Sequence, residues 1–443
     1  MSKPIVAVVG RPNVGKSTLF NKLIGQRLSI VEDTPGVTRD RIFADCEWLD
    51  RHFLLVDTGG IEPAAEDVIQ VQMRRQAQLA IDSADVIILV VDVREGVTAT
   101  DKDVADMLQK SGKPVVVCVN KCDALGDPPP EFYEFYNLGI GELCPVSSTH
   151  GHGTGDLLDM VFSHIGADTA EDYNGEYIKV AVIGKPNVGK SSLVNHLAGD
   201  ERMIVSDIAG TTRDAVDTVI ENKYGKYVFI DTAGIRKKSR IFEKIEHYSV
   251  LRAYMSVERA DVCVIMIDAT EGFTEQDSKI AGYAHEAGKA CVVAVNKWDA
   301  IEKDDKTMTE FRKKLEMDLS FMSYAQIVFI SALTGQRIGR LYEEINHAAS
   351  NHSARITTGK LNELLAYCTT RVQPPSDKGK RLKIYYMTQA ATRPPEFVFF
   401  VNRKDLFHFS YQRYLENQLR ETFGLTGTPI RFVVRERDTK DTK

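Results

Sequence analysis

Short apolar runs alternate with longer amphipathic stretches along most of this chain. Unbroken apolar runs of a few residues are typical of strands that are buried on both faces. The stretches between them have helical spacing, as in Lys16–Gly25. Strand and helix in alternation predict a mostly parallel sheet with helices on both faces. In the amino-terminal part the predicted strands are Lys3–Gly10, His52–Thr58, Asp85–Asp92, Pro114–Asn120 and Leu143–Ser147.

This arrangement occurs twice. The octapeptide GRPNVGKS at Gly10–Ser17 returns as GKPNVGKS at Gly184–Ser191. DTGG then returns as DTAG, NKCD returns as NKWD, and a final serine-containing loop follows in both copies. An internal repeat of this length indicates a duplicated domain. We therefore predict one α/β domain over residues 1–166, a polar linker over 167–175, and a second α/β domain over 176–350.

Beyond residue 350 the pattern changes. The order helix, strand, strand, helix, strand predicts a small α+β domain over residues 351–443. The two helices are expected at Lys360–Val372 and Ser410–Gly424, and the three strands at Arg381–Ala391, Glu396–Phe407 and Thr428–Arg437.

This last domain is basic, whereas the rest of the chain is acidic. It has 17 Lys and Arg against 9 Asp and Glu, although the whole chain has a formal net charge of -6. A basic domain on an acidic body favours a polyanion partner such as RNA. The alternative is a solvated face that docks on the acidic body. The basic clusters are Lys378, Lys380, Arg381 and Lys383, and Arg431, Arg435 and Arg437.

Cysteine usage and hydropathy indicate the cytoplasm. The seven cysteines are odd in number and lack CxxC spacing, which is typical of a reducing compartment. The apolar runs are far shorter than the roughly 20 residues of a membrane span. We therefore expect no membrane partner.

Both octapeptides fit the phosphate-binding pattern GxxxxGK[ST] in its strand–loop–helix context. The glycines let successive N–H groups face one anion, and the helix amino end adds partial positive charge. We expect Lys16 and Lys190 to contact the β- and γ-phosphates, and Ser17 and Ser191 to bind Mg²⁺. The predicted loops comprise Gly10, Arg11, Pro12, Asn13, Val14, Gly15, Lys16 and Ser17, and Gly184, Lys185, Pro186, Asn187, Val188, Gly189, Lys190 and Ser191.

DTGG and DTAG also follow apolar strands. A carboxylate there can hold the water shell of Mg²⁺, which assigns Asp57 and Asp231 to the metal. The N–H of Gly60 or Gly234 can approach a γ-phosphate. The alternative is an aspartate that caps a turn. The predicted set is Asp57, Thr58, Gly59, Gly60 and Ile61, and Asp231, Thr232, Ala233, Gly234 and Ile235.

NKCD and NKWD are predicted to read the base. A strand-end aspartate can accept hydrogen bonds from N1–H and the 2-amino group of guanine, both of which adenine lacks, so such a site discriminates strongly. The alternative is a polar turn, which does not explain the repetition. The residues are Asn120, Lys121, Cys122 and Asp123, and Asn296, Lys297, Trp298 and Asp299.

Together these motifs resemble the five signatures of Ras-like P-loop GTPase domains. Two such domains followed by a basic domain resemble the bacterial GTPase family called Der or EngA, over essentially the whole chain. The resemblance implies GTP, GDP and Mg²⁺ as ligands and a KH-like last domain. It also implies that Thr38 and Thr212 are switch threonines that reach Mg²⁺. Ser147, Ser148, Ser331 and Ala332 would back the base.

Hydrolysis needs a further explanation. The glutamine that orients water in Ras-type enzymes follows DxxG, and here Ile61 and Ile235 occupy that place. Members of the family that the chain resembles use K⁺, held partly by a phosphate-loop asparagine. Asn13 and Asn187 match that position. The alternative is that these asparagines only brace the loop.

The resemblance implies a GTP-hydrolysing nucleotide switch in maturation of the large ribosomal subunit, with ribosomal RNA as partner. We expect a monomer and no DNA partner. Two alternatives are a GTP-dependent enzyme acting on a small substrate and a GTPase with another RNA partner. A membrane-remodelling GTPase would need an amphipathic paddle, for which the sequence offers no segment.

Overall fold

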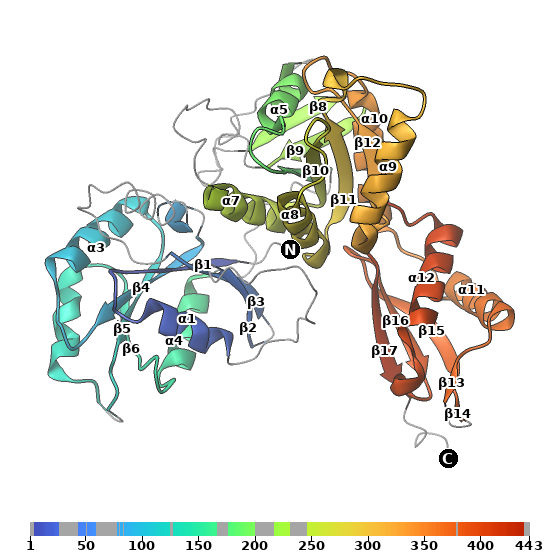
Figure 1. The fold of residues 1–443 in the computed structure, drawn as a ribbon. Helices are drawn as coiled ribbons and strands as arrows, with labels where there is room; N and C mark the ends of the chain where they lie inside the picture. The colour runs from blue at the N-terminus through green and yellow to red at the C-terminus, as the bar shows by residue number, and fades with distance from the viewer. Residues whose placement is uncertain are drawn as a thin grey trace. The chain divides into compact units, whose positions relative to one another are not determined.

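The computed structural model of the chain forms two compact units, Met1–Glu171 and Asp172–Lys443, which are described separately (Figure 1). The predicted linker 167–175 lies outside the described residues, and the domain boundaries remain predictions. The described residues are 4–25, 43–49, 51–58, 78, 80–82, 84–124, 127–165, 176–199, 217–230, 246–377 and 380–437.

The first unit is built on a six-stranded sheet in the order β2-β3-β1-β4-β5-β6. The strands from β3 to β6 pair in parallel, and β2 runs antiparallel to β3. The elements are β1 (Ile5–Val9), α1 (Lys16–Ile24), β2 (Phe43–Trp48), β3 (Arg51–Asp57), β4 (Val86–Asp92), α3 (Ala99–Ser111), β5 (Val115–Asn120), η1 (Pro130–Leu138), β6 (Glu142–Pro145) and α4 (Thr154–His164).

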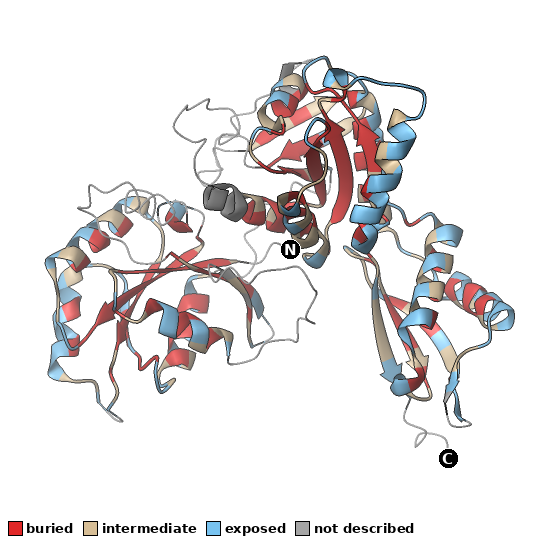
Figure 2. Cartoon of the chain, viewed as in Figure 1, coloured by how far each residue is buried: buried red, intermediate tan, exposed pale blue. Residues whose placement is uncertain are grey.

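The central strands of this sheet are buried along their whole length, as their apolar runs predict. Every residue of β1, β4 and β5 is buried (Figure 2). Alternate side chains of these strands pack with apolar side chains of α1 and α4 in one core cluster, for example Val8 with Leu19 and Leu157. The carboxyl ends of β1, β4 and β5 then lead directly into the predicted loops.

The second GTPase-like sheet repeats this topology. Its order, β8-β9-β7-β10-β11-β12, matches the first sheet strand for strand, with β8 antiparallel to β9 and parallel pairs elsewhere. The elements are β7 (Ile178–Ile183), α5 (Lys190–Gly199), β8 (Thr218–Asn222), β9 (Gly225–Phe229), α7 (Glu246–Arg259), β10 (Val262–Asp268), α8 (Glu275–Glu286), β11 (Ala290–Asn296), η3 (Trp298–Ala300), α9 (Thr307–Asp318), η4 (Ser320–Met322), β12 (Gln326–Phe329) and α10 (Ile338–Ser353).

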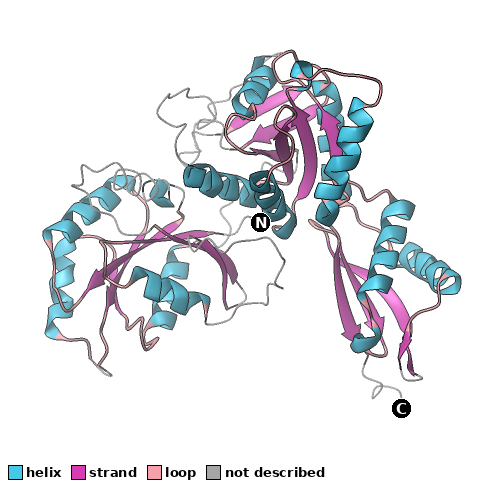
Figure 3. Cartoon of the chain, in the orientation of Figure 1, coloured by secondary structure: helices cyan, strands magenta, loops and turns pink. Residues whose placement is uncertain are grey.

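The last domain is an α+β layer in which α11 and α12 cover one face of the sheet β15-β16-β17 (Figure 3). β15 and β16 are antiparallel, and β16 and β17 are parallel. The elements are α11 (Thr358–Arg371), β13 (Ser376–Asp377), β14 (Lys380–Arg381), β15 (Ile384–Ala391), β16 (Glu396–Val401), η5 (Lys404–Leu406), α12 (Phe409–Phe423) and β17 (Arg431–Glu436).

The predicted order of elements in this domain is confirmed, but three strand boundaries were wrong. The strand predicted to reach Phe407 ends at Val401, and residues 404–406 form a 3-10 turn. Asn402 causes the break, because its side chain accepts from Lys383 N at 2.8 Å and donates to Arg381 O at 2.9 Å. The same contacts delay the start of β15 to Ile384.

The strand predicted from Thr428 begins only at Arg431, because the preceding loop docks on the second GTPase-like domain. Gly427 N donates to Tyr324 O, and Gly427 O accepts from Cys291 N, each at 2.8 Å. The buried His352 ring lies 2.9 Å from Thr428 Oγ1. The segment Gly424–Gly427, with the sequence GLTG, therefore attaches the last domain to the second GTPase-like domain.

Gly427 can be tested against a matched glycine in the same loop. Gly427 has φ 73°, and an added Cβ would lie 2.7 Å from Cβ of Ala348 in α10, whereas Gly424 has φ 66° and open space around it. The left-handed conformation costs either alanine about 1–2 kcal/mol. Overpacking against α10 adds about 1–3 kcal/mol for Gly427→Ala alone. Urea denaturation should show the larger loss for Gly427→Ala. Equal losses in the two variants would contradict tight docking at this loop.

Candidate functional site

Both phosphate loops curl around their own lysine. Lys16 is 5% exposed, and its Nζ donates to Arg11 O at 2.6 Å. Lys190 Nζ donates to Gly184 O at 2.8 Å and to Lys185 O at 2.7 Å. Each ammonium group therefore sits in the concave side of its loop at the amino end of α1 or α5, where an anion would meet both the charge and the helix dipole.

In the first copy a buried asparagine ties the phosphate loop to the last loop. Asn120, at the end of β5, donates through Nδ2 to Val14 O at 2.8 Å. Its Oδ1 accepts from Ser148 N at 3.0 Å and from Ser148 Oγ at 2.7 Å. Gly15 must be a glycine here, because a Cβ would lie 2.4 Å from Asn120 Nδ2 at φ 95°.

The second copy has the same bridge. Asn296 Nδ2 donates to Val188 O at 2.7 Å, and Asn296 Oδ1 accepts from Ala332 N at 2.8 Å. Gly189 lies in the same close contact, with a Cβ position 2.2 Å from Asn296 Nδ2. The asparagines of NKxD therefore connect two loops of the protein to each other. Ser148, which replaces the alanine in the first copy, keeps the backbone hydrogen bond and adds one from its hydroxyl group.

Two carboxylates that the sequence analysis did not single out hold the lysines of NKxD. Lys121 Nζ lies 2.5 Å from Oδ2 of the buried Asp92, and Lys297 Nζ lies 2.5 Å from that of Asp268. Burial raises the pKa of Asp268, but the bonds from Lys297 and Thr270 outweigh it and hold the pKa below its ordinary value. The signal that could have revealed Asp92 and Asp268 in the sequence was their equivalent position at the end of a strand in both repeats.

The second residue of each octapeptide, where the two copies differ, is anchored to a helix further along the chain, α3 in the first copy and α8 in the second. Arg11 Nε lies 3.2 Å from Asp101 Oδ1, and Lys185 Nζ lies 2.7 Å from Glu271 Oε2 and 3.6 Å from Asp277 Oδ2. Asp101 and Asp277 also close the capping boxes of α3 and α8. The backbone carbonyls that hold Lys16 and Lys190 are thereby fixed to a second element.

Two of the predicted metal-binding residues of the first copy, Ser17 and Asp57, are neighbours. Ser17 Oγ lies 3.2 Å from Asp57 Oδ2, and a hydroxyl beside a carboxylate is the oxygen set that Mg²⁺ prefers. The remaining predicted switch and DxxG residues lie outside the described residues. These are Thr38, Gly59, Gly60, Ile61, Thr212, Asp231, Thr232, Ala233, Gly234 and Ile235.

Several other predicted residues are placed inside the fold. Val14 and Val188 are fully buried beneath the phosphate loops. Thr58 Oγ1 donates to Val8 O at 2.8 Å. Cys122 and Trp298, between the lysine and aspartate of NKxD, are buried too. These side chains support the loops, so only their backbones can face a ligand.

The aspartates of NKxD lie in different surroundings. Asp123 Oδ1 accepts from Ser147 Oγ at 2.5 Å, and Asp123 Oδ2 pairs with Arg94 Nη2 at 2.6 Å. The bond from Ser147, aided by the charge of Arg94, holds the pKa of Asp123 below its ordinary value. Asp299 is exposed. Both aspartates follow strands β5 and β11 at the same edge as the phosphate loops.

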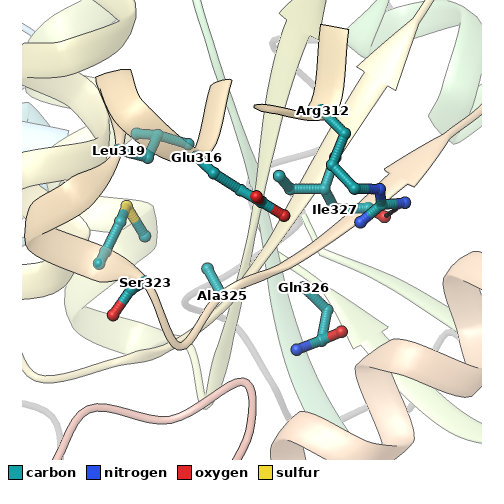
Figure 4. Close-up of a pocket in the computed structure, with 8 residues that line it drawn as sticks. Arg312, Glu316, Leu319, Ser323, Ala325, Gln326 and Ile327 are labelled. Atoms are coloured by element: carbon teal, nitrogen blue, oxygen red, sulfur yellow. Dashed lines mark hydrogen bonds between the residues drawn. The ribbon is translucent and has the colours of Figure 1, made fainter. Parts of the chain in front are cut away.

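A separate cavity of about 320 Å³ lies on the second GTPase-like domain, between α9, η4 and β12 (Figure 4). Arg312 and Glu316 from α9 and Gln326 from β12 line it, together with apolar side chains. It contains none of the predicted nucleotide residues, so it is not the nucleotide site.

Comparison with known proteins agrees with this geometry. A family model described as a 50S ribosome-binding GTPase matches residues 5–121 and 179–297. The model of the KH-domain-like carboxy-terminal part of EngA bacterial GTPase enzymes matches residues 355–435. The chain is 63% identical to GTPase Der of Acetivibrio thermocellus over 99% of this chain and all of that protein. It is 62% identical to GTPase Der of Ruminiclostridium cellulolyticum over the full length of both.

This chain is similar to a crystal structure of Era in complex with MgGDPNP and 16S ribosomal RNA nucleotides. The match covers 60% of this chain and 94% of the Era chain, with 25% identity and a TM-score of 0.32. A TM-score below 0.5 is too low to transfer any residue or partner.

The fold and the duplicated site define a P-loop GTPase with two tandem GTPase domains, which binds guanine nucleotide and hydrolyses GTP. The chain belongs to the Der (EngA) family of GTPases. In the described part of the chain, no helix is long and apolar enough to cross a bilayer.

The lysines predict a pH dependence of nucleotide binding. Burial lowers the pKa of Lys16 and of Lys190 to about 8. Above that pH the empty sites hold neutral lysines, so nucleotide binding must take up a proton, and the affinity falls by up to about tenfold per pH unit. Calorimetry of GDP binding at pH 9, in buffers of different ionisation enthalpy, measures this uptake. Binding at pH 9 without proton uptake would contradict the lowered pKa values.

Proposed function

We propose that this GTPase is a nucleotide switch in maturation of the large ribosomal subunit, and that its KH-like domain contacts ribosomal RNA. One observation carries the proposal: the basic domain is docked on the second GTPase domain through the loop around Gly427. Nucleotide-dependent changes in that domain therefore bear directly on the part of the chain suited to a polyanion. The matched family description, a 50S ribosome-binding GTPase, supports the same partner.

Strand β11 forms the connection. Its residue Cys291 donates to Gly427 O, and its last residue, Asn296, bridges the loops of the second nucleotide site. At roughly 3.3 Å per residue, five residues separate these contacts by about 17 Å. Every residue of β11 is buried. The strand supports a model in which the second GTPase domain and the KH-like domain move as one body.

The basic residues of the KH-like domain are available to a partner. Those predicted from the sequence and described in the structure are all exposed, which suits contacts with phosphates. Arg381 and Lys383 also line a cavity of about 470 Å³ with Asn402. Lys378 lies outside the described residues. The exposed set is Lys380, Arg381, Lys383, Arg431, Arg435 and Arg437.

We also propose K⁺ as the activating cation at Asn13 and Asn187. Both residues are exposed and have left-handed φ values of 67° and 62°. Within the described ranges neither side-chain amide has a hydrogen-bond partner, whereas an asparagine that braced its loop would need one. A bound cation beside the β- and γ-phosphates would stabilise the charge that develops there during hydrolysis.

The remaining role assignments are part of the same proposal. Lys16 and Lys190, with the N–H groups of Gly60 and Gly234, stabilise the γ-phosphate during hydrolysis. Thr38 and Thr212 complete the Mg²⁺ shell in the GTP state. The protein acts in the cytoplasm as a monomer.

Steady-state GTP turnover in K⁺ and in Na⁺ tests the cation. We expect K⁺ to raise kcat, and Asn13→Ala with Asn187→Ala to remove the difference, because each change deletes a cation ligand. Loss of one such electrostatic contact typically lowers kcat by about 10²-fold or more. GDP affinity serves as the control and should change little. Equal turnover of the unchanged protein in the two salts would exclude K⁺ activation.

Co-sedimentation with purified large ribosomal subunits tests the switch. We expect binding with a non-hydrolysable GTP analogue, release with GDP, and loss of analogue-dependent binding in Lys190→Ala, because Lys190 belongs to the domain that carries the KH-like domain. Lys16→Ala, the same change in the first copy, is the matched control. Absence of binding in every state, with GTP hydrolysis intact, would contradict the proposal and favour the small-substrate or other-RNA alternatives.

A further inference from the structure

The duplication allows the two guanine-reading positions to be compared residue by residue. The segment VVDVREG, which covers the end of β4 and the turn after it, corresponds to MIDATEG at the end of β10. Asp92 and Asp268 are equivalent, since each pairs with the lysine of its own NKxD motif. Two residues further on, Arg94 in the first copy therefore corresponds to Thr270 in the second.

Arg94 reaches the carboxylate that faces the base. Its backbone N donates to Asp92 Oδ1 at 3.0 Å, which fixes the backbone position from which the side chain extends. Its Nη2 lies 2.6 Å from Asp123 Oδ2, with side chains 65% and 32% exposed. Because Ser147 Oγ occupies Asp123 Oδ1, both oxygens that guanine N1–H and the 2-amino group need already have donors.

Thr270 does the opposite in the second copy. Its N and Oγ1 donate to Asp268 Oδ1 at 2.9 Å and 2.7 Å, so the side chain folds back on its own turn. Asp299 is exposed, and within the described residues it has no ion pair. A guanine base entering the second site displaces no charged group from Asp299.

We propose that Arg94 is an internal competitor of the guanine base, which makes the first site the weaker and more salt-dependent of the two. The inference rests on the proposed guanine contact of Asp123. A base that pairs with Asp123 must first displace the guanidinium group. Exposed ion pairs of this kind are weak, so the expected penalty in Kd is about two- to fivefold.

The effect of salt on GDP affinity distinguishes competition by Arg94 from a purely structural role of this residue. Added salt screens an exposed ion pair. It therefore weakens the ion pair between Arg94 and Asp123, and the free-energy cost of displacing Arg94 when the base binds at the first site becomes smaller. Relative to a first site that lacks Arg94, the unchanged first site should gain GDP affinity as ionic strength rises.

The test is titration of the full chain with fluorescent GDP at low and high salt. Asp299→Asn removes guanine pairing from the second site, so that binding at the first can be followed. In that background we expect Arg94→Thr to tighten GDP about two- to fivefold at low salt and less at high salt. Thr270→Arg, in an Asp123→Asn background, should weaken the second site by a similar factor. Lys110→Thr, which removes an exposed charge from the last turn of α3, should change neither.

Two outcomes distinguish competition by Arg94 from the guanine contact of Asp123 on which it rests. If Asp123→Asn leaves GDP affinity unchanged, the guanine contact itself fails and the inference falls with it. If Asp123→Asn abolishes GDP binding at the first site but Arg94→Thr has no effect at either salt concentration, the guanine contact stands and the competition by Arg94 is excluded. In the Asp123→Asn protein, Arg94→Thr should leave xanthosine diphosphate affinity unchanged, because the partner of Arg94 is gone.

Discussion

Each nucleotide site depends on one buried amide group at the end of a central strand. Asn120 and Asn296 each donate to a phosphate-loop carbonyl and accept from the backbone of the last loop. A buried amide without these partners would cost about 1–3 kcal/mol, so the two loops hold the asparagine as firmly as it holds them. The close approach also explains the glycine before each lysine, since Gly15 and Gly189 leave no room for a side chain.

This shared frame lets the surroundings diverge without loss of the site. The phosphate loops differ at one residue, and Arg11 and Lys185 both reach the aspartate of the following capping box. An arginine fork and a single ammonium satisfy that carboxylate differently. Around the base the copies differ further, because Arg94 pairs with the NKxD aspartate and Thr270 does not. Two sites with the same motifs can therefore differ in affinity, so that one site can be filled while the other is empty.

The features that could be predicted from the sequence are those that depend on local pattern and on repetition. Apolar runs located the central strands, and the repeated motifs located the loops at their carboxyl ends. Asp92 and Asp101 were missed because their ion-pair partners lie about 30 and 90 residues away in the chain, and only the repeated strand-end position of Asp92 signalled its importance. The end of β16 at Val401 depends on the contacts of Asn402 with another strand. The docking of Gly427 depends on the shape of a different domain.

That docking changes the meaning of the KH-like domain. In a KH domain that clamps RNA, the GXXG loop lies between two helices and faces the nucleic acid. Here the backbone of the GLTG segment lies against Cys291 and Tyr324 of the second GTPase domain and against Asn351 near the end of α10. The proposed RNA contact therefore falls to other surfaces, where exposed arginines and lysines would supply charge without base recognition. Charge alone would bind many RNAs, so selectivity for one partner has to come from the combined shape of the docked domains and from the nucleotide states that arrange them.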